Sequence, residues 1–147
     1  RHVNEYRPQM MQVSEPAFQE KMRASKEAQV IKEAIKQASR NVKILVDAGV
    51  PVAMGTDTGA QIGRWQGYFE HVEMELMVKG GLTPMQVLVA ATGDAARVMR
   101  LGKDLGTIQP GKWADFLVLN ADPLADIRNT RQIDSVWIAG RRLTNLN

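Results

Sequence analysis

An apolar run at residues 50–54 constrains the fold of this 147-residue chain more than any other segment. Its sequence, Val-Pro-Val-Ala-Met, is apolar on both sides of the pleat, which is typical of a central parallel strand covered on both faces. Gly55-Thr56-Asp57 follows directly. Because α/β folds gather functional groups at the carboxyl ends of parallel strands, we expect an α/β fold with Asp57 at a functional edge.

The residues before this run show the periodicity of one long helix, from about residue 17 to residue 48. Apolar residues recur there at spacings of three and four, and they are Ala28, Ile31, Ile35, Ala38, Val42 and Leu45. Gly49 is a typical helix stop. A loop with three glycines covers residues 58–68, and a second helix is predicted over 69–79, ended by Gly80-Gly81.

A third helix start is written into residues 83–86. Thr83 is a good N-cap, Pro84 suits the first helical position, and Gln86 completes a capping box. We expect this helix to run to about residue 91. We expect residues 92–94, Thr-Gly-Asp, to break the helix before a short helix over 95–99.

The character of the chain changes after residue 101. Two short apolar segments, 114–119 and 133–138, predict strands, and Gly140 marks a turn. We therefore divide the chain into a helix–strand–helix–helix part, residues 1–101, and a small β unit, residues 102–147.

Composition excludes several function classes. The net charge is +3, and the basic residues near the N-terminus alternate with glutamates, which indicates a solvated helix face and no nucleic-acid partner. No apolar run approaches the roughly 18 residues of a membrane span. The chain has no cysteine, which excludes disulfides and thiolate-bound zinc and fits a cytoplasmic protein. It begins at Arg1 without an initiator methionine, so we expect a piece of a longer protein.

An ordered series of motifs resembles the amidohydrolase superfamily. Gly55-Thr56-Asp57 with its glycine-rich loop is similar to the eighth barrel strand of that superfamily. Residues 71–78 and 81–86 are similar to the segment that follows, and residues 106–119, Gly-Thr-Ile-Gln-Pro-Gly-Lys-Trp-Ala-Asp-Phe-Leu-Val-Leu, match the return into its flanking β-sandwich. The resemblance covers about residues 25–143 and is closest to imidazolonepropionase-like and Xaa-Pro-dipeptidase-like members.

This resemblance implies a fold, a cofactor and a ligand. The fold would be the C-terminal part of a (β/α)8 TIM barrel, followed by strands of a small β-sandwich. The complete enzyme would hold one or two divalent metal ions, zinc being the expected one. Of the superfamily's metal ligands only the strand-8 aspartate maps onto this chain, as Asp57. The two histidines are His2 and His71, and neither matches a ligand position.

Asp57 is the candidate catalytic and metal-binding residue. A divalent ion makes hydroxide available near neutral pH, and a carboxylate beside it can take the proton of the water and return it to a leaving amine. The alternative is an aspartate that caps a helix or orders a loop. One carboxylate alone does not hold zinc, which takes three or four protein ligands. We therefore expect the isolated chain to be inactive.

Other residues divide into candidate substrate contacts and structural residues. The loop after Asp57 would lie at the barrel mouth, and its candidate substrate-binding residues are Gln61, Arg64, Trp65 and Tyr68. A solvent-exposed connection is the equal alternative. We interpret His71 as a structural histidine, Glu73 and Glu75 as solvent-facing or close to a ligand, Lys112 as a turn residue, Asp115 as a structural carboxylate, and Trp113 and Trp137 as core or interface anchors.

Two function classes follow. The first is a piece of a metal-dependent amidohydrolase that cleaves amide or cyclic amide C–N bonds, with small dipeptide or N-acyl substrates; a deaminase of the same superfamily is its neighbour. The second is a non-catalytic truncated module with a structural or interaction role. In both cases we expect open strand edges to bind the N-terminal half of a barrel or a second copy of the chain.

Overall fold

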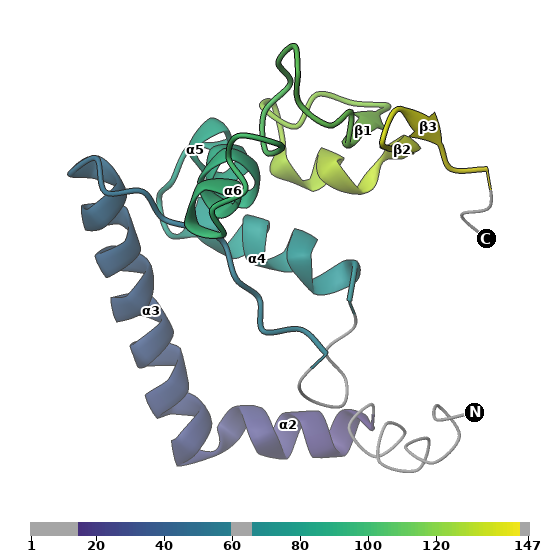
Figure 1. The fold of residues 1–147 in the computed structure, drawn as a ribbon. Helices are drawn as coiled ribbons and strands as arrows, with labels where there is room; N and C mark the ends of the chain where they lie inside the picture. The colour runs from purple at the N-terminus through teal and green to yellow at the C-terminus, as the bar shows by residue number, and fades with distance from the viewer. Residues whose placement is uncertain (1–14, 60–65, 145–147) are drawn as a thin grey trace.

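The computed structural model describes residues 15–59 and 66–144. Their elements follow the order α2 (Pro16–Ala24), α3 (Lys26–Asp47), α4 (Tyr68–Lys79), α5 (Pro84–Val89), the π-helical turn η1 (Ala90–Asp94), α6 (Ala95–Val98), β1 (Phe116–Leu119), the 3-10 helix η2 (Ile127–Arg131), β2 (Ile133–Ile138) and β3 (Arg141–Arg142). Helices α2 and α3 form an L-shaped arm, α4 to α6 form the centre, and the small sheet lies beyond them (Figure 1). None of the helices in the described part of the chain combines the length and the hydropathy that a membrane span requires.

The long helix expected over residues 17–48 is two helices. Ser25 separates them because its backbone is extended and its side chain accepts a hydrogen bond from the Ala28 N–H, which makes it the N-cap of α3. The predicted end is confirmed: α3 stops at Asp47, and Gly49 takes the left-handed conformation with φ of 76°.

The strand expected over residues 50–54 is not formed within the described part of the chain. The segment pairs with none of the three described strands, and the Met54 N–H donates to the carbonyl of Ala90, 3.0 Å away. A central parallel strand needs a neighbour on each side for its backbone groups, and the described residues supply neither. The segment is therefore a connection between α3 and the loop that carries Asp57.

The helix starts and stops after the loop agree with the sequence. Helix α4 ends at Lys79 with Gly80 as its C-cap, and Thr83 and Gln86 form a complete capping box at the start of α5. The break expected at residues 92–94 is wrong, because these residues form the π-helical turn η1, which joins α5 to α6 without interruption. Gly106 packs against this turn, where an added Cβ would lie 2.4 Å from the Ala96 Cβ.

The small sheet is antiparallel, in the order β1-β2-β3. In its register Phe116 lies opposite Trp137, and the two rings stack with centroids 5.5 Å apart. The carboxylate of Asp115 accepts a 2.7 Å hydrogen bond from the N–H of Ala139 at the β2–β3 turn. Both expected strands are confirmed, and the third adds a short edge at Arg141–Arg142.

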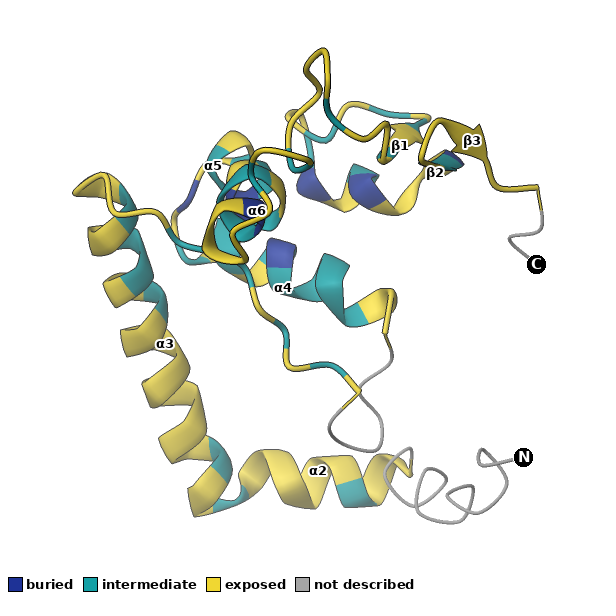
Figure 2. Ribbon diagram, in the orientation of Figure 1, coloured by how far each residue is buried: buried dark blue, intermediate teal, exposed yellow. Residues whose placement is uncertain are grey.

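The core lies between the central helices and η2. Its buried apolar residues are Met74 on α4, Leu82, Val87 on α5 and Ile127 on η2. Figure 2 shows burial concentrated on these elements, whereas α2 and α3 have no buried residue. The helix α4, which follows the Asp57 loop, is thus the element that joins the centre to the β unit.

Candidate functional site

Asp57 lies at the end of the extended segment that leaves α3. Its side chain is exposed and makes no ion pair or hydrogen bond with the described residues. It also caps none of the described helices, since the N-cap of α4 is Gly67. The carboxylate is therefore open to a ligand that approaches from outside this part of the chain.

The backbone of Asp57 is in the left-handed region, with φ of 52°. L-residues other than glycine occupy this region at a cost, although aspartate and asparagine tolerate it better than most. Such conformations persist where the surroundings fix them, and they cluster at functional sites. The neighbours of Asp57 in the chain, Thr56 and Thr58, supply that fixation.

Glu70 holds both threonines. The Thr58 hydroxyl donates to Glu70 Oε1 at 2.6 Å, and the Thr56 hydroxyl lies 3.0 Å from the Thr58 hydroxyl and 3.4 Å from the same carboxylate oxygen. The hydrogen bond from Thr58 lowers the pKa of Glu70 and outweighs the opposing effect of burial. Glu70 is therefore ionised at neutral pH and accepts charge-assisted hydrogen bonds.

Sequence reasoning missed Glu70. Its only local signal is its place in the first turn of α4, where an acidic residue is favoured by the helix dipole in any case. The contact with Thr58 spans 12 positions and depends on how the loop returns to α4. No spacing rule predicts such a contact.

The candidate substrate-binding residues are only partly described. Gln61, Arg64 and Trp65 lie outside the described residues. Tyr68 is exposed, and its ring meets Phe69 edge-on at 5.4 Å and lies 5.2 Å below the guanidinium of Arg131. In this structure Tyr68 therefore contacts the β unit, and its role toward a substrate stays a prediction.

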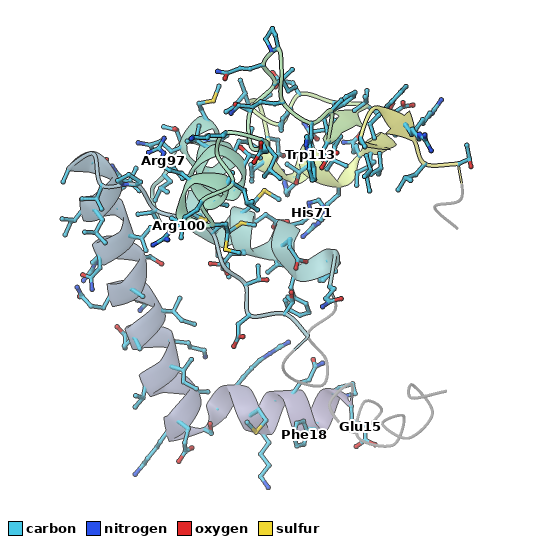
Figure 3. All side chains as sticks on the ribbon, in the orientation of Figure 1. Glu15, Phe18, His71, Arg97, Arg100 and Trp113 are labelled. Atoms are coloured by element: carbon cyan, nitrogen blue, oxygen red, sulfur yellow. The ribbon has the colours of Figure 1, made fainter. Side chains whose placement is uncertain are left out.

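The structural role predicted for His71 is confirmed. His71 extends from α4 toward the layer that contains η2 (Figure 3), where Nδ1 lies 2.9 Å from the Thr130 hydroxyl oxygen. The Thr130 hydroxyl donates its own proton to the Ile127 carbonyl, so His71 Nδ1 must be the donor in the other bond. Burial lowers the pKa of His71, and the nearby positive charge of Arg131 adds to that effect.

The two glutamates that follow His71 are not solvent-facing. Glu75 forms a 2.5 Å ion pair with Arg131, and its side chain is 19% exposed. Glu73 lies in an apolar groove of about 270 Å³ between α3 and α4, and burial there raises its pKa. Helical periodicity places both residues on α4 but does not show which neighbouring elements cover them.

The remaining structural predictions divide. Lys112 is a turn residue, as expected, because its backbone N–H donates to the Gln109 carbonyl at 3.2 Å. Its Nζ also donates to the Gly102 carbonyl and to the Thr107 hydroxyl at 2.7 and 2.6 Å. Asp115 is a structural carboxylate. Trp137 packs on Phe116, whereas Trp113 is 63% exposed, so it is not a core residue among the described residues and its alternative role as an interface anchor stays a prediction.

The described residues do not make a metal site by themselves. They contain no group of three or more histidine, aspartate or glutamate side chains that could hold an ion. Asp57 supplies one oxygen ligand of a suitable kind, whereas a catalytic zinc ion takes about three protein ligands. Any further ligands would have to come from outside these residues.

Comparisons with known proteins agree with this arrangement. The model of the Amidohydrolase family matches residues 11–143. An imidazolonepropionase from Deinococcus deserti is 37% identical over 103 residues, which is 67% of this chain and 25% of that protein. The solved structure of molinate hydrolase superposes with a TM-score of 0.66 at 32% identity, over 73% of this chain and 26% of that one. A Xaa-Pro dipeptidase with bound methionine gives 0.64 at 29% identity, over 75% and 25%.

The chain belongs to the amidohydrolase family. It spans about a quarter of the length of the imidazolonepropionase and of the two solved structures it matches. One of these solved structures is a hydrolase by its printed name, molinate hydrolase.

Proposed function

We propose that this chain supplies the C-terminal part of a metal-dependent amidohydrolase that cleaves amide or cyclic amide C–N bonds. The observation behind the proposal is the state of Asp57. Its carboxylate is exposed, free of ion pairs among the described residues, and held in a strained backbone conformation by neighbours that are themselves clamped. If Asp57 had a purely structural role, its carboxylate oxygens would be expected to cap a helix or to form an ion pair.

Asp57 has two roles in this proposal. It would be one ligand of a divalent cation such as zinc, with one or two ions in the complete enzyme. When bound, such an ion lowers the pKa of its water to about 7. Asp57 would take the proton from the attacking water and return it to the leaving amine, which requires a carboxylate that is open on one side.

Small amides are the substrate class that we propose, with dipeptides and N-acyl compounds as candidates. The names of the relatives support a hydrolase of small molecules, since they include imidazolonepropionase, molinate hydrolase and Xaa-Pro dipeptidase. Gln61, Arg64, Trp65 and Tyr68 stay the proposed substrate contacts: an arginine suits a carboxylate group, and aromatic rings suit an apolar side chain.

The proposed architecture is the last part of a (β/α)8 barrel, residues 1–101, and strands of a flanking β-sandwich, residues 102–147. The unpaired segment 50–57 and the exposed apolar residues of α3 support it, because a barrel would cover both. We propose that the partner is the N-terminal part of such a barrel and that the assembled protein forms homo-oligomers. The cysteine-free sequence supports a cytoplasmic location.

A non-catalytic module is the second candidate, and one observation favours it. The described residues hold no group of metal-binding side chains, so this part of the chain has an architecture without a complete reaction centre. A deaminase of the same family is a variant of the first proposal. It differs in having ammonia as the leaving group.

Metal binding and catalysis separate these proposals. The chain would be dialysed against zinc twice, first by itself and then in complex with the N-terminal three-quarters of an amidohydrolase barrel. We expect no stoichiometric zinc on the chain alone, and zinc with amide hydrolysis in the complex. Asp57→Asn should abolish hydrolysis in the complex without preventing assembly. Full activity of Asp57→Asn would overturn the catalytic proposal, and assembly without zinc would favour the structural module.

A further inference from the structure

We propose that Glu70 is a positioning residue for Asp57, acting through the hydroxyls of Thr56 and Thr58. The inference deepens the proposed function and rests on it for its catalytic meaning. Glu70 does not touch the carboxylate of Asp57 through any described hydrogen bond. It fixes the residues on both sides of it instead.

Glu70, Thr56 and Thr58 form a clamp on either side of Asp57, and its geometry is specific. Oε1 of Glu70 accepts a hydrogen bond from the Thr58 hydroxyl at 2.6 Å. The Thr56 hydroxyl lies 3.0 Å from the Thr58 hydroxyl and 3.4 Å from Glu70 Oε1. The Thr58 N–H also points to the Thr56 hydroxyl oxygen, 3.4 Å away, so the two threonines close a turn around Asp57. A single carboxylate on α4 therefore holds a three-residue turn.

The turn needs this support because of the conformation of Asp57. A left-handed φ at an aspartate costs free energy, and an extended backbone is the ordinary alternative. The segment before it has no strand partner in the described chain, so the backbone ladder that would fix a strand end is not available. Glu70 is the described group that joins this turn to a packed helix.

The second oxygen of Glu70 supports a positional role. Oε2 is buried and has no hydrogen-bond partner among the described residues. Buried carboxylate oxygens are normally paired, so an unpaired one calls for an explanation, and a positional role supplies it. Replacing Glu70 by an apolar residue would remove this unfavourable burial, so this oxygen does not contribute to the stability of the helix.

Three variants of the full 147-residue chain test the clamp. Glu70→Leu removes the acceptor, Glu70→Gln keeps an acceptor oxygen at the same position, and Glu73→Leu is the control, since Glu73 lies one turn further along α4 and forms none of these hydrogen bonds. The φ of Asp57 is measured by NMR coupling constants, with circular dichroism to show that the helices remain. We expect Asp57 to leave the left-handed region in Glu70→Leu and to keep it in the other two.

A second pair of variants keeps the test decisive where Glu70→Leu disturbs α4. Thr58→Val should reproduce the effect of Glu70→Leu, and Thr58→Ser should not, because serine keeps the hydroxyl. An unchanged φ of Asp57 in both Glu70→Leu and Thr58→Val would overturn the inference, and this readout needs no activity. In an active assembly with the barrel, Glu70→Leu should lower kcat about 10- to 100-fold with little change in KM, and Glu70→Gln should restore it.

The two proposals fail in different ways. If Asp57→Asn stays fully active in the assembly, the proposed function is wrong, whatever the conformational variants show. If Asp57→Asn is inactive while Glu70→Leu and Thr58→Val leave both φ and kcat unchanged, the function stands and the positioning role is wrong.

Discussion

The N-terminal arm and the central body solve the burial of apolar surface in opposite ways. In the arm, formed by α2 and α3, no residue is buried, although α3 carries apolar side chains at helical spacing. In the body, formed by α4 to α6 and η2, apolar residues distant in sequence share one core. The same periodicity is therefore present in both regions, but the arm reaches that core through the partly buried Val42 and Val46 of α3, while Ile31, Ile35 and Leu45 stay exposed.

Polar contacts follow the same division. The body has a histidine–threonine hydrogen bond and a glutamate–arginine ion pair between α4 and η2, both partly shielded from water. The arm has pairs one turn apart on its own surface, such as Lys36–Glu33. The difference teaches that the body is specified by contacts within this chain, whereas much of the apolar stripe on α3, including Ile31, Ile35 and Leu45, stays exposed among the described residues.

The largest expected contrast in the free energy of unfolding comes from truncating one leucine in each of the two regions. Leu82→Ala should lower the free energy of unfolding by about 3 kcal/mol, because Leu82 is only 3% exposed and its removal leaves a cavity. Leu45→Ala should cost less than about 1 kcal/mol, because Leu45 on α3 is 44% exposed. Urea denaturation followed by circular dichroism measures both. Equal losses would show that the arm is packed in solution.

A pair of glycines sharpens the comparison inside the C-terminal half. Gly106→Ala should cost about 2–3 kcal/mol, because the new Cβ would meet the Ala96 Cβ at 2.4 Å and the backbone φ is 90°. Gly111→Ala has a similar φ of 85° but no atom within 4 Å, so only the backbone cost of about 1 kcal/mol remains. Thermal unfolding of both variants separates packing from backbone strain, and an equal shift would contradict the close packing at Gly106.

Ion pairs should show a smaller contrast. Glu75→Gln weakens the pair with Arg131, whose partners are 19% and 35% exposed, and should cost about 1–2 kcal/mol. Glu33→Gln weakens the pair with Lys36, whose partners are 72% and 62% exposed, and should cost less than about 0.5 kcal/mol. The measurement is urea denaturation at low and high salt. A larger loss in Glu33→Gln would reverse the assignment of the two regions.

The smallest expected effect is the pH dependence of the body. Burial and Arg131 lower the pKa of His71 in the folded chain, so the unfolded chain binds the proton more tightly. Stability should therefore fall as the pH drops below about 6.5 toward the folded pKa, and be fully retained above it. Glu70 and Glu75 oppose the shift, which keeps it modest. His71→Asn should flatten the dependence of the free energy of unfolding on pH between about pH 7.5 and pH 5.5, by a fraction of ~1 kcal/mol. An unchanged slope would show that another group titrates in this range.

Local signals predicted much of the fold. The capping box of Thr83, the stop at Gly49 and the strand over Ile133–Ile138 all depend on neighbours a few residues away, and the structure confirms each of them. The same local signals did not predict the helix break at Ser25, because a serine is tolerated inside a helix and its capping role depends on the backbone turning there.

Long-range relations explain what the sequence did not predict. The segment 50–54 has the composition of a central strand, but pairing requires other strands, and composition does not show whether the chain contains them. The roles of Glu70 and Glu75 depend on which surfaces meet α4. Asp57 could be selected as a candidate from its position after an apolar run, whereas the clamp that holds it could not.

The wide turn η1 has a consequence for how Asp57 is placed. A π-helical turn carries one residue more than a regular α-helical turn. The carbonyl of Ala90, at its start, receives the N–H of Met54, three residues before Asp57. Deleting one residue from this turn, for example Gly93, would rewind the helix and withdraw that anchor. The π-helical turn η1 therefore helps to fix the position of Asp57, through the hydrogen bond between Met54 and Ala90.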